Sequence, residues 1–332
     1  MARGSKPRGH VDLHAHLDGS ITVGIARELA RLQGVELPAG DDDELLRLLS
    51  VPADCASLND FLRCFDLPCS LLQTAEGLTA AVRLVLSSMA ADGTAYAELR
   101  FAPQLHGERG MSQEEAVRAA EAGLVGAAIP ANLILCCMRG EGNEAANGET
   151  VRVAREHLVA DGGVVALDLA GAEALFPTEG YRGLFGRVRE LGIPFTIHAG
   201  EADGPTSVRC ALEMGAARIG HGVRAAEDPA LVDELAERGI PLEMCPTSNR
   251  QTHAVEDMGA YPLVGFLERG VRVTVNTDDM AIERTTLSGE FAYLRREFGF
   301  TAAHERAVTA NAIDAAFTSA AVKGWLRTEL LG

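Results

Sequence analysis

Two histidines near the start of the chain are spaced so that they could bind one metal ion. His14 and His16 lie two residues apart in a run, 10–16, whose alternating polar and apolar residues predict a β-strand. On a strand both side chains project from the same face, about 6.6 Å apart along it. Two converging imidazoles are natural ligands for a single divalent cation. A His-x-His pair is common, so its chemistry depends on partners from elsewhere in the chain.

The stretch 194–201 offers such a partner. It places His198 at the end of a short apolar run and Glu201 one sharp turn later. Taken alone, this stretch also fits a strand that ends in a buried histidine followed by a solvated glutamate. Near neighbours such as His221 and Asp278 would change that interpretation, because imidazoles and one carboxylate together favour a borderline metal such as zinc. Such a metal activates water at neutral pH.

Further polar residues could act on a substrate held beside the metal. Glu201 and Asp279 each follow a candidate ligand, and carboxyl groups kept protonated by burial or by neighbouring negative charge can donate to ring nitrogens. His221 stands between two glycines and could hold the attacking water or shuttle its proton. Polar residues that recur on one face of the strands are expected to support the ligands. These residues are Glu98, Arg100, Asp168, Glu243, Arg272 and Thr274.

Eight short strands, mostly separated by helices, must position these groups. Each predicted strand is a short run bounded by turn residues or helical segments. The strands are expected at 10–16, 95–102, 132–138, 164–170, 195–198, 218–220, 241–245 and 271–276. Regular alternation calls for a parallel sheet, and eight units close a (β/α)8 TIM barrel, whose site lies at the carboxyl ends of the strands. An open doubly wound sheet is the alternative.

No linker or repeat divides the chain, so 1–332 is predicted to be a single barrel domain. Residues 1–9 are basic, lack a following apolar segment and are expected to be disordered. Residues 40–91 are expected to form a helical insertion, or lid, after the first strand, and extra C-terminal helices begin near residue 288.

Composition limits the partners. The 47 acidic residues against 30 lysines and arginines give a net charge of −17, which repels nucleic acid and anionic membranes. Seven cysteines without a Cys-x-x-Cys pair argue against a disulfide framework or a cysteine-ligated zinc, and indicate a cytoplasmic protein. His106-Gly-Glu108 matches the His-x-Glu of cytidine-type deaminases, but no Pro-Cys-x-x-Cys follows it.

Taken together, eight motifs make the sequence similar to the adenosine deaminase family. They occur in the family's order between residues 10 and 279 and cover most of the chain. The motifs are His14-Ala-His16-Leu-Asp-Gly19, Ser57-Leu-Asn-Asp-Phe-Leu62 with Phe65, Cys137-Met-Arg139, Asp168-Leu-Ala-Gly171, His198-Ala-Gly-Glu201, Gly220-His-Gly222, Cys245-Pro-Thr-Ser248 and Asn276-Thr-Asp-Asp279.

The resemblance implies a (β/α)8 barrel and hydrolytic deamination at C6 of a purine nucleoside. It implies one zinc ion held by His14, His16, His198 and Asp278. Glu201 would give a proton to N1, and His221 would orient and deprotonate the attacking water. Asp279 would hydrogen-bond N7, the backbone of Gly171 would address N3, and Asp18 would hold ribose hydroxyls. Phe61, Leu62 and Phe65 would form an apolar lid, and Ser248 would support Asp278.

Substrate choice remains open at the sequence level. Relatives acting on free adenine usually carry Glu at the Asp18 position, so this residue favours a nucleoside. Gly140, Ala172 and Met280 depart from the family's usual His, acid and Pro, which makes a 5′-modified or N6-substituted adenine nucleoside an alternative. Free adenine, another reaction of metal-dependent amidohydrolases, a metal other than zinc such as iron or cobalt, and a non-catalytic binding barrel complete the alternatives.

Overall fold

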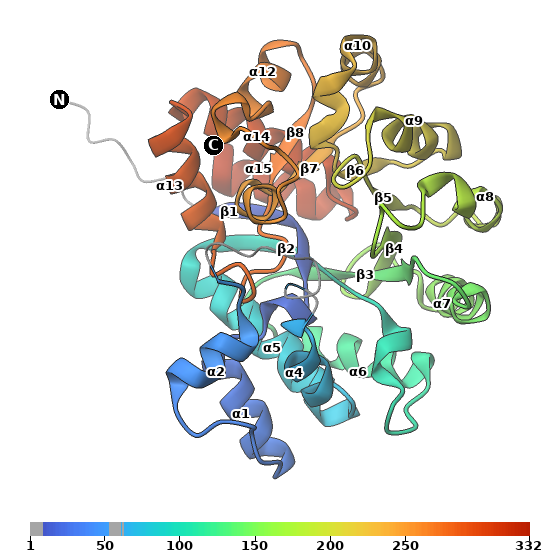
Figure 1. Cartoon of the computed structure of the whole chain (residues 1–332), viewed down its shortest axis with the longest axis vertical. Helices are drawn as coiled ribbons and strands as arrows, with labels where there is room; N and C mark the ends of the chain where they lie inside the picture. The colour runs from blue at the N-terminus through green and yellow to red at the C-terminus, as the bar shows by residue number, and fades with distance from the viewer. Residues whose placement is uncertain (1–8, 53–60, 62) are drawn as a thin grey trace.

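Eight parallel strands form the centre of the molecule in the computed structural model, which describes residues 9–52, 61 and 63–332 (Figure 1). Four strands pair in the order β1-β2-β3-β4 and four in the order β5-β6-β7-β8. The strands are β1 His10–His16, β2 Thr94–Phe101, β3 Ala131–Met138, β4 Val164–Ala170, β5 Thr196–Ala199, β6 Arg218–His221, β7 Leu242–Met244 and β8 Val273–Val275.

Two backbone bridges close these halves into a barrel. Leu167 pairs with Phe195 at one seam, and Ala15 pairs with Asp278 at the other. At the second seam the amide of His16 donates to the carbonyl of Asp278, at 2.9 Å. The predicted (β/α)8 barrel is therefore confirmed, and each predicted strand overlaps an observed one.

Most barrel helices begin and end where the sequence provides capping groups. Ser112 and Glu115 form a capping box at the start of α6, and Gly215 ends α9 in the left-handed conformation. The α-helices from the first strand to the fifth are α1 Val23–Gln33, α2 Asp42–Leu49, α4 Asp66–Leu71, α5 Ala75–Asp92, α6 Gln113–Leu124, α7 Glu144–His157 and α8 Arg182–Glu190. The later ones are α9 Pro205–Met214, α10 Pro229–Arg238, α11 Pro246–Gln251, α12 Leu263–Glu268, α13 Leu287–Glu297, α14 Ala302–Ala315 and α15 Ala320–Leu331.

Short 3-10 helices occupy several of the turns between these elements. They are η1 Asp18–Ser20, η2 Pro103–His106, η3 Thr178–Tyr181, η4 Val223–Glu227 and η5 Met258–Ala260. Short α11 differs from the prediction, which placed residues 247–249 at the end of the seventh strand. Pro246 at its first turn is a start signal that could have indicated it.

The segment 40–91 is helical over its described part, as predicted. Helices α1, α2 and α4 lie together at the bottom of the view in Figure 1, whereas α5 packs against α6 and β2 as a member of the barrel ring. The predicted disordered start, 1–9, lies outside the described residues except for Gly9. At the other end of the chain, α14 packs against β1 and β8, and α15 packs against α14.

Aliphatic side chains from the strands and the surrounding helices form one large buried core. None of the helices in the described part of the chain has the length and apolarity needed to cross a bilayer.

Candidate metal centre and active site

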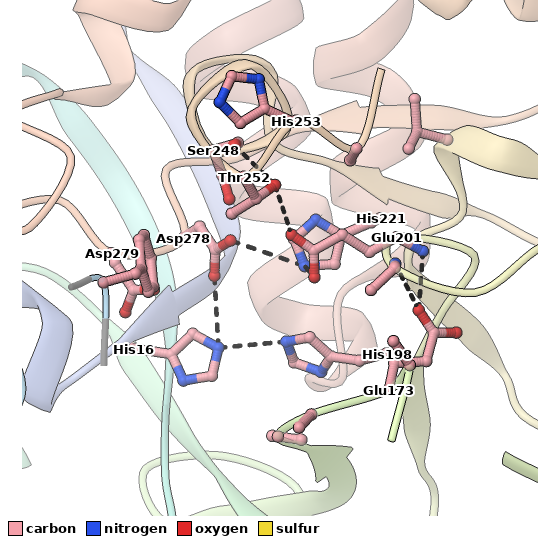
Figure 2. Close-up of a pocket in the computed structure, with 18 of the residues that line it drawn as sticks. His16, Glu173, His198, Glu201, His221, Ser248, Thr252, His253, Asp278 and Asp279 are labelled. Carbon is pink, nitrogen blue, oxygen red and sulfur yellow. Dashed lines mark hydrogen bonds and ion pairs between the residues drawn. The ribbon is translucent and has the colours of Figure 1, made fainter. Parts of the chain in front are cut away.

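A cavity of about 850 Å³ is lined by residues at the carboxyl ends of the strands. His16 comes from the end of β1, His198 from β5 and His221 from β6, while Asp278 follows β8. Figure 2 shows these side chains and Glu201 directed toward one another in the pocket. The parallel barrel thus brings together groups that are far apart in the sequence, as predicted.

Four ligand-type atoms are spaced as a bound cation requires. Nε2 of His198 lies 3.0 Å from Nε2 of His14 and 3.3 Å from Nε2 of His16. Oδ1 of Asp278 lies 3.2 Å and 3.4 Å from the same atoms of His14 and His16. Ligands about 2.0–2.2 Å from a tetrahedral zinc ion lie roughly 3.3–3.6 Å apart. These four distances allow the predicted ligands to share a zinc-sized ion. A group of ligand-type atoms that all lie within 4.8 Å of one another comprises His14, His198 and Asp278 with His221 in place of His16.

Buried carboxylates orient two of these imidazoles. Nδ1 of His14 contacts Oε2 of Glu243 at 2.7 Å, and Nδ1 of His198 lies 2.9 Å from Oδ2 of Asp168. The contact of His14 is a hydrogen bond, whereas Nδ1 of His198 lies beside Asp168 without forming one. The carboxylate charge favours a proton on Nδ1 of each ring, which leaves the Nε2 lone pairs facing each other. Lone pairs held 3.0 Å apart repel one another unless a proton or a metal ion lies between them, so this spacing is compatible with a metal at this point.

Arg100 keeps both supporting carboxylates ionised. It donates to Asp168 at 2.8 Å and to Glu243 at 2.7 Å. Burial alone would raise the pKa of each carboxyl, but the guanidinium charge helps to hold both pKa values well below their ordinary range. Arg100, Asp168 and Glu243 are inward-facing polar residues that contact the proposed ligands or each other, as expected.

His221 lies in the same cluster, between the proposed metal ligand Asp278 and the proposed proton donor Glu201. Its Nε2 lies 3.6 Å from Oδ2 of Asp278 and 3.4 Å from Oε2 of Glu201. Burial lowers the pKa of His221 well below its ordinary value, which favours a neutral ring. His221 and Asp278 both have left-handed backbones, with φ of +57° and +61°, a strained conformation that is concentrated at functional sites.

The two carboxyl groups predicted to contact the purine are protonated more readily than usual. Burial and the negative charges of Asp278 and Glu173 raise the pKa of Glu201 to about 8. Burial and the nearby charge of Asp278 raise the pKa of Asp279 well above its ordinary value. These directions are the ones that hydrogen-bond donation to ring nitrogens requires. Glu201 also accepts a hydrogen bond from Thr252, at 3.1 Å.

Gly19 makes room for Asp279. A Cβ atom at Gly19 would overlap the carboxylate of Asp279, so any side chain there would displace it. Asp18 is buried and lines the same cavity, and burial raises its pKa to about 6. Two adjacent residues therefore shape this side of the cavity: Asp18 is a potential ribose ligand, and Gly19 leaves the space that the Asp279 carboxylate occupies.

The remaining predicted contacts are partly in place. Gly171, at φ +103°, lines the cavity together with Phe61 and Phe65. Leu62, the third predicted lid residue, lies outside the described residues. Ser248 is buried at the cavity, but no hydrogen bond joins its hydroxyl to Asp278 in the structure. Its proposed support of Asp278 therefore stays a prediction.

Glu173 is a site residue that the sequence reasoning missed. Its carboxylate accepts from the backbone amides of Gly200, Glu201, Ala202 and Asp203 at 2.7–3.0 Å, and from the hydroxyl of Ser207. Ala172 stands where the family usually has an acid, and the acid of this chain is the next residue, Glu173. Glu173 fixes the backbone of the turn that carries Glu201.

The three departures from the family pattern differ in their positions. Ala172 lines the cavity, but Gly140 and Met280 are not among the described residues that do. The amide of Gly140 donates to the hydroxyl of Tyr181 at 2.9 Å. Loss of the acid at residue 172 is therefore the departure that changes the pocket wall directly.

Comparisons with known proteins agree with this geometry. The family model described as adenosine deaminase matches residues 9–331. An adenosine deaminase of Haemophilus ducreyi is 48% identical over 325 residues, which cover 96% of this chain and 94% of that protein. An adenosine deaminase of Enterococcus faecalis is 39% identical, with 93% of this chain and 92% of that protein covered.

Solved structures give the same result. The chain resembles an adenine deaminase from Arthrobacter aurescens, with a TM-score of 0.86, 28% identity and 98% of both chains covered. It also resembles an N6-methyl-AMP deaminase from Arabidopsis thaliana, with a TM-score of 0.81, 27% identity and 97% and 96% of the two chains covered. The protein is thus a member of the adenosine deaminase family.

Proposed function

We propose that the protein is a zinc-dependent aminohydrolase that converts adenosine, or a closely related adenine nucleoside, and water into the inosine-type product and ammonia. The observation that carries the proposal is the pairing, in one cavity, of a metal-type cluster with two carboxyl groups of raised pKa, Glu201 and Asp279. The cluster would face C6, and the two carboxyl groups would face the nitrogens on either side of it.

Each residue then has a defined task. His14, His16, His198 and Asp278 would hold zinc, which when bound lowers the pKa of a water molecule and makes it a nucleophile at neutral pH. Glu201 would donate its proton to N1 as the water oxygen adds to C6, so that the ring nitrogen accepts the displaced electron pair. The C6–N bond then breaks: one proton of the added water passes to the amino group, which leaves as ammonia, the other returns to Glu201, and the oxygen stays on C6 as the carbonyl.

The other groups would bind and orient the nucleoside. Asp279 would hydrogen-bond N7, and the backbone of Gly171 would address N3. Asp18 would hold ribose hydroxyls, while Phe61 and Phe65, with Leu62, would cover the base. His221 would orient the attacking water, which lies on the same side of the ring as the metal ligands.

Charge supports a nucleoside in preference to a nucleotide. Arg224 is the single arginine among the described residues that line the cavity, and no described lysine lines it. Its guanidinium contacts Glu227 at 2.7 Å. Acidic side chains at the cavity, apart from the two proposed proton donors, include Asp18, Glu173, Glu227 and Glu256. A 5′-phosphate would lose its hydration and meet mainly negative charge there, which opposes binding.

A substrate panel tests this proposal. Purified, zinc-loaded protein is mixed separately with adenine, adenosine, 2′-deoxyadenosine, AMP, a 5′-substituted adenosine and an N6-methylated adenosine. Release of ammonia, or of methylamine, and the change in the purine ultraviolet band are followed. We expect the highest kcat/KM for a nucleoside with a free 6-amino group. No amine release from any adenine nucleoside, with stoichiometric metal bound, would overturn the proposal.

A further inference from the structure

A buried hydrogen-bond chain leads from Tyr261 to the ring of His221. The hydroxyl of Tyr261 lies 2.9 Å from Oδ1 of Asn249, and Nδ2 of Asn249 lies 3.1 Å from Nδ1 of His221. Asn249 and His221 are almost completely buried, and 6% of Tyr261 is exposed. No step of the proposed reaction uses Asn249 or Tyr261, so the chain requires a separate explanation.

Donor counting fixes the direction of this chain. The phenolic hydroxyl of Tyr261 has one proton, and Oδ1 of Asn249 is the acceptor that the structure gives it. If the amide were turned over, its NH2 group would face the tyrosine oxygen, and the phenolic proton would lose that acceptor. The observed orientation therefore satisfies one donor more, and it points the NH2 group of Asn249 at Nδ1 of His221.

An amide donor at Nδ1 decides where the histidine proton lies. Nδ1 must present its lone pair to the NH2 group, so the proton of the neutral ring is on Nε2. The surroundings of Nε2 agree, because carboxyl oxygens of Glu201 and Asp278, which can accept a hydrogen bond, lie 3.4 Å and 3.6 Å from it. A proton on Nε2 is attracted to these oxygens, whereas a lone pair would be repelled.

The contrast with the metal-side histidines is direct. His14 and His198 present Nδ1 to the carboxylates of Glu243 and Asp168, whose negative charge favours a proton on that nitrogen. His221 presents Nδ1 to an amide donor instead. One pocket therefore holds histidines of opposite tautomers, and the partner on the far side of each ring selects which one.

We infer that Tyr261 and Asn249 hold His221 as the Nε2–H tautomer, so that His221 donates a hydrogen bond into the cavity and does not take a proton from the attacking water. This inference rests on the proposed function for its catalytic consequence and replaces the expected role of His221 as a base. Asn249 and Tyr261 are positioning residues, since they act through His221. The oxygen that adds to C6 becomes more negative as the reaction proceeds, and a fixed donor beside it stabilises that charge.

The tautomer can be observed without substrate. Protein labelled with 15N at histidine is examined by long-range proton–nitrogen NMR, in the zinc-loaded and the metal-free form, and the His221 signals are assigned by their loss in His221→Gln. We expect a protonated Nε2 and an unprotonated Nδ1. A proton on Nδ1 with a free Nε2 would overturn the inference, whether or not the protein is active.

Asn249→Asp is the most informative variant, because its carboxylate would accept a hydrogen bond from Nδ1 of His221 and favour a proton on that nitrogen. In this variant we expect the Nδ1–H form, unchanged zinc content by elemental analysis, similar KM and a kcat lowered by about a hundredfold, as for the loss of one donor to a developing oxyanion. If His221 carries its proton on Nδ1 in this variant and kcat is unchanged, hydrogen-bond donation by Nε2 of His221 does not contribute to catalysis. Tyr261→Phe is the milder variant: it should keep the fold and give a mixture of tautomers.

Failure of the proposed function can be told apart from failure of this inference. The NMR spectrum of the wild-type protein decides the tautomer by itself, even if a variant fails to fold. The expected spectrum together with no deamination of any adenine nucleoside would refute the function and leave the tautomer intact. Active protein with the opposite tautomer would refute the inference and leave the function intact.

Discussion

Glu201 is a carboxyl group buried in the cavity beside Asp278 and Glu173, and burial is the main cause of its changed protonation. A carboxylate here would be surrounded by other negative charges and shielded from water, so its neutral form is favoured and its pKa rises to about 8. At neutral pH the side chain is therefore a proton donor. The same physical cause acts on Asp279.

Glu201→Gln removes the proton that N1 would receive while keeping the size of the side chain. We expect kcat for adenosine to fall by about 10²- to 10⁴-fold, the usual contribution of a general acid, with metal content and nucleoside binding retained. Steady-state kinetics, elemental analysis and equilibrium binding measure the three properties. Glu227→Gln, at the same cavity, is the matched control and should keep its kcat. Full turnover by Glu201→Gln would refute the assignment.

Asp278→Ala should instead reduce metal binding. Its carboxylate is the one negatively charged group among the four proposed ligands, so its loss removes both a ligand atom and the charge that compensates the cation. We expect zinc affinity to fall by at least about tenfold. Asp279→Asn, one residue further, should keep the metal and raise KM. Equal zinc content in wild type and Asp278→Ala, measured after dialysis against a chelator, would contradict the ligand assignment.

At the scale of elements, the turn after β5 is held by a side chain from the turn after β4. Glu173 gathers four backbone amides and one hydroxyl around one carboxylate, so two neighbouring barrel units are joined at the point where Glu201 leaves the strand. Charge-assisted bonds of this kind are stronger than neutral ones, and they satisfy amides that the turn leaves without partners.

Glu173→Gln should loosen this turn. The amide group brings an NH2 donor toward backbone donors, so we expect a loss of about 2–4 kcal/mol in the free energy of unfolding, with faster hydrogen exchange at 200–203 and a lower kcat. Urea unfolding and exchange measured by mass spectrometry test this. Glu179→Gln, on an exposed side chain, is the control. Unchanged exchange at 200–203 would show that Glu173 does not hold the turn.

The sequence predicts elements better than it predicts the contacts between them. The strands could be found because each is a short apolar run next to a turn signal, and the barrel then predicts that His14, His198 and Asp278 converge. Glu173 was missed because its partners are backbone amides, which leave no trace in the sequence. The path from Tyr261 to His221 depends on side-chain orientation across 40 residues of chain, which periodicity cannot supply.

In the molecule as a whole, the same backbone pairing that closes the barrel also positions residues of the site. Ala15 and Asp278 pair at the seam between the first and last strands, and the proposed ligands His16 and Asp278 flank that seam. Stability and site geometry should therefore be linked, although some buried groups affect stability alone. His106 is such a group, because it is fully buried and neither ring nitrogen hydrogen-bonds to a described residue.

His106 should make the protein less stable in acid. Burial lowers its pKa from 6.5 to about 4. Below pH 6.5 the unfolded chain therefore binds a proton that the folded protein does not, and stability falls as the pH decreases toward 4, by up to about 3 kcal/mol. Urea unfolding of the wild type and of His106→Leu between pH 4 and pH 7 should give a smaller acid loss in the variant. Identical pH slopes would exclude this role.

The proposed reaction is the attack of water on C6 of an adenine nucleoside in this cavity. The most direct measurement is mass spectrometry of the product formed from adenosine by the zinc-loaded protein in 18O-labelled water. We predict inosine that carries one heavy oxygen on the base, one ammonia released per inosine, and the loss of both products in Glu201→Gln. Adenosine that remains unchanged in the presence of stoichiometric zinc, or inosine without the label, would contradict the account.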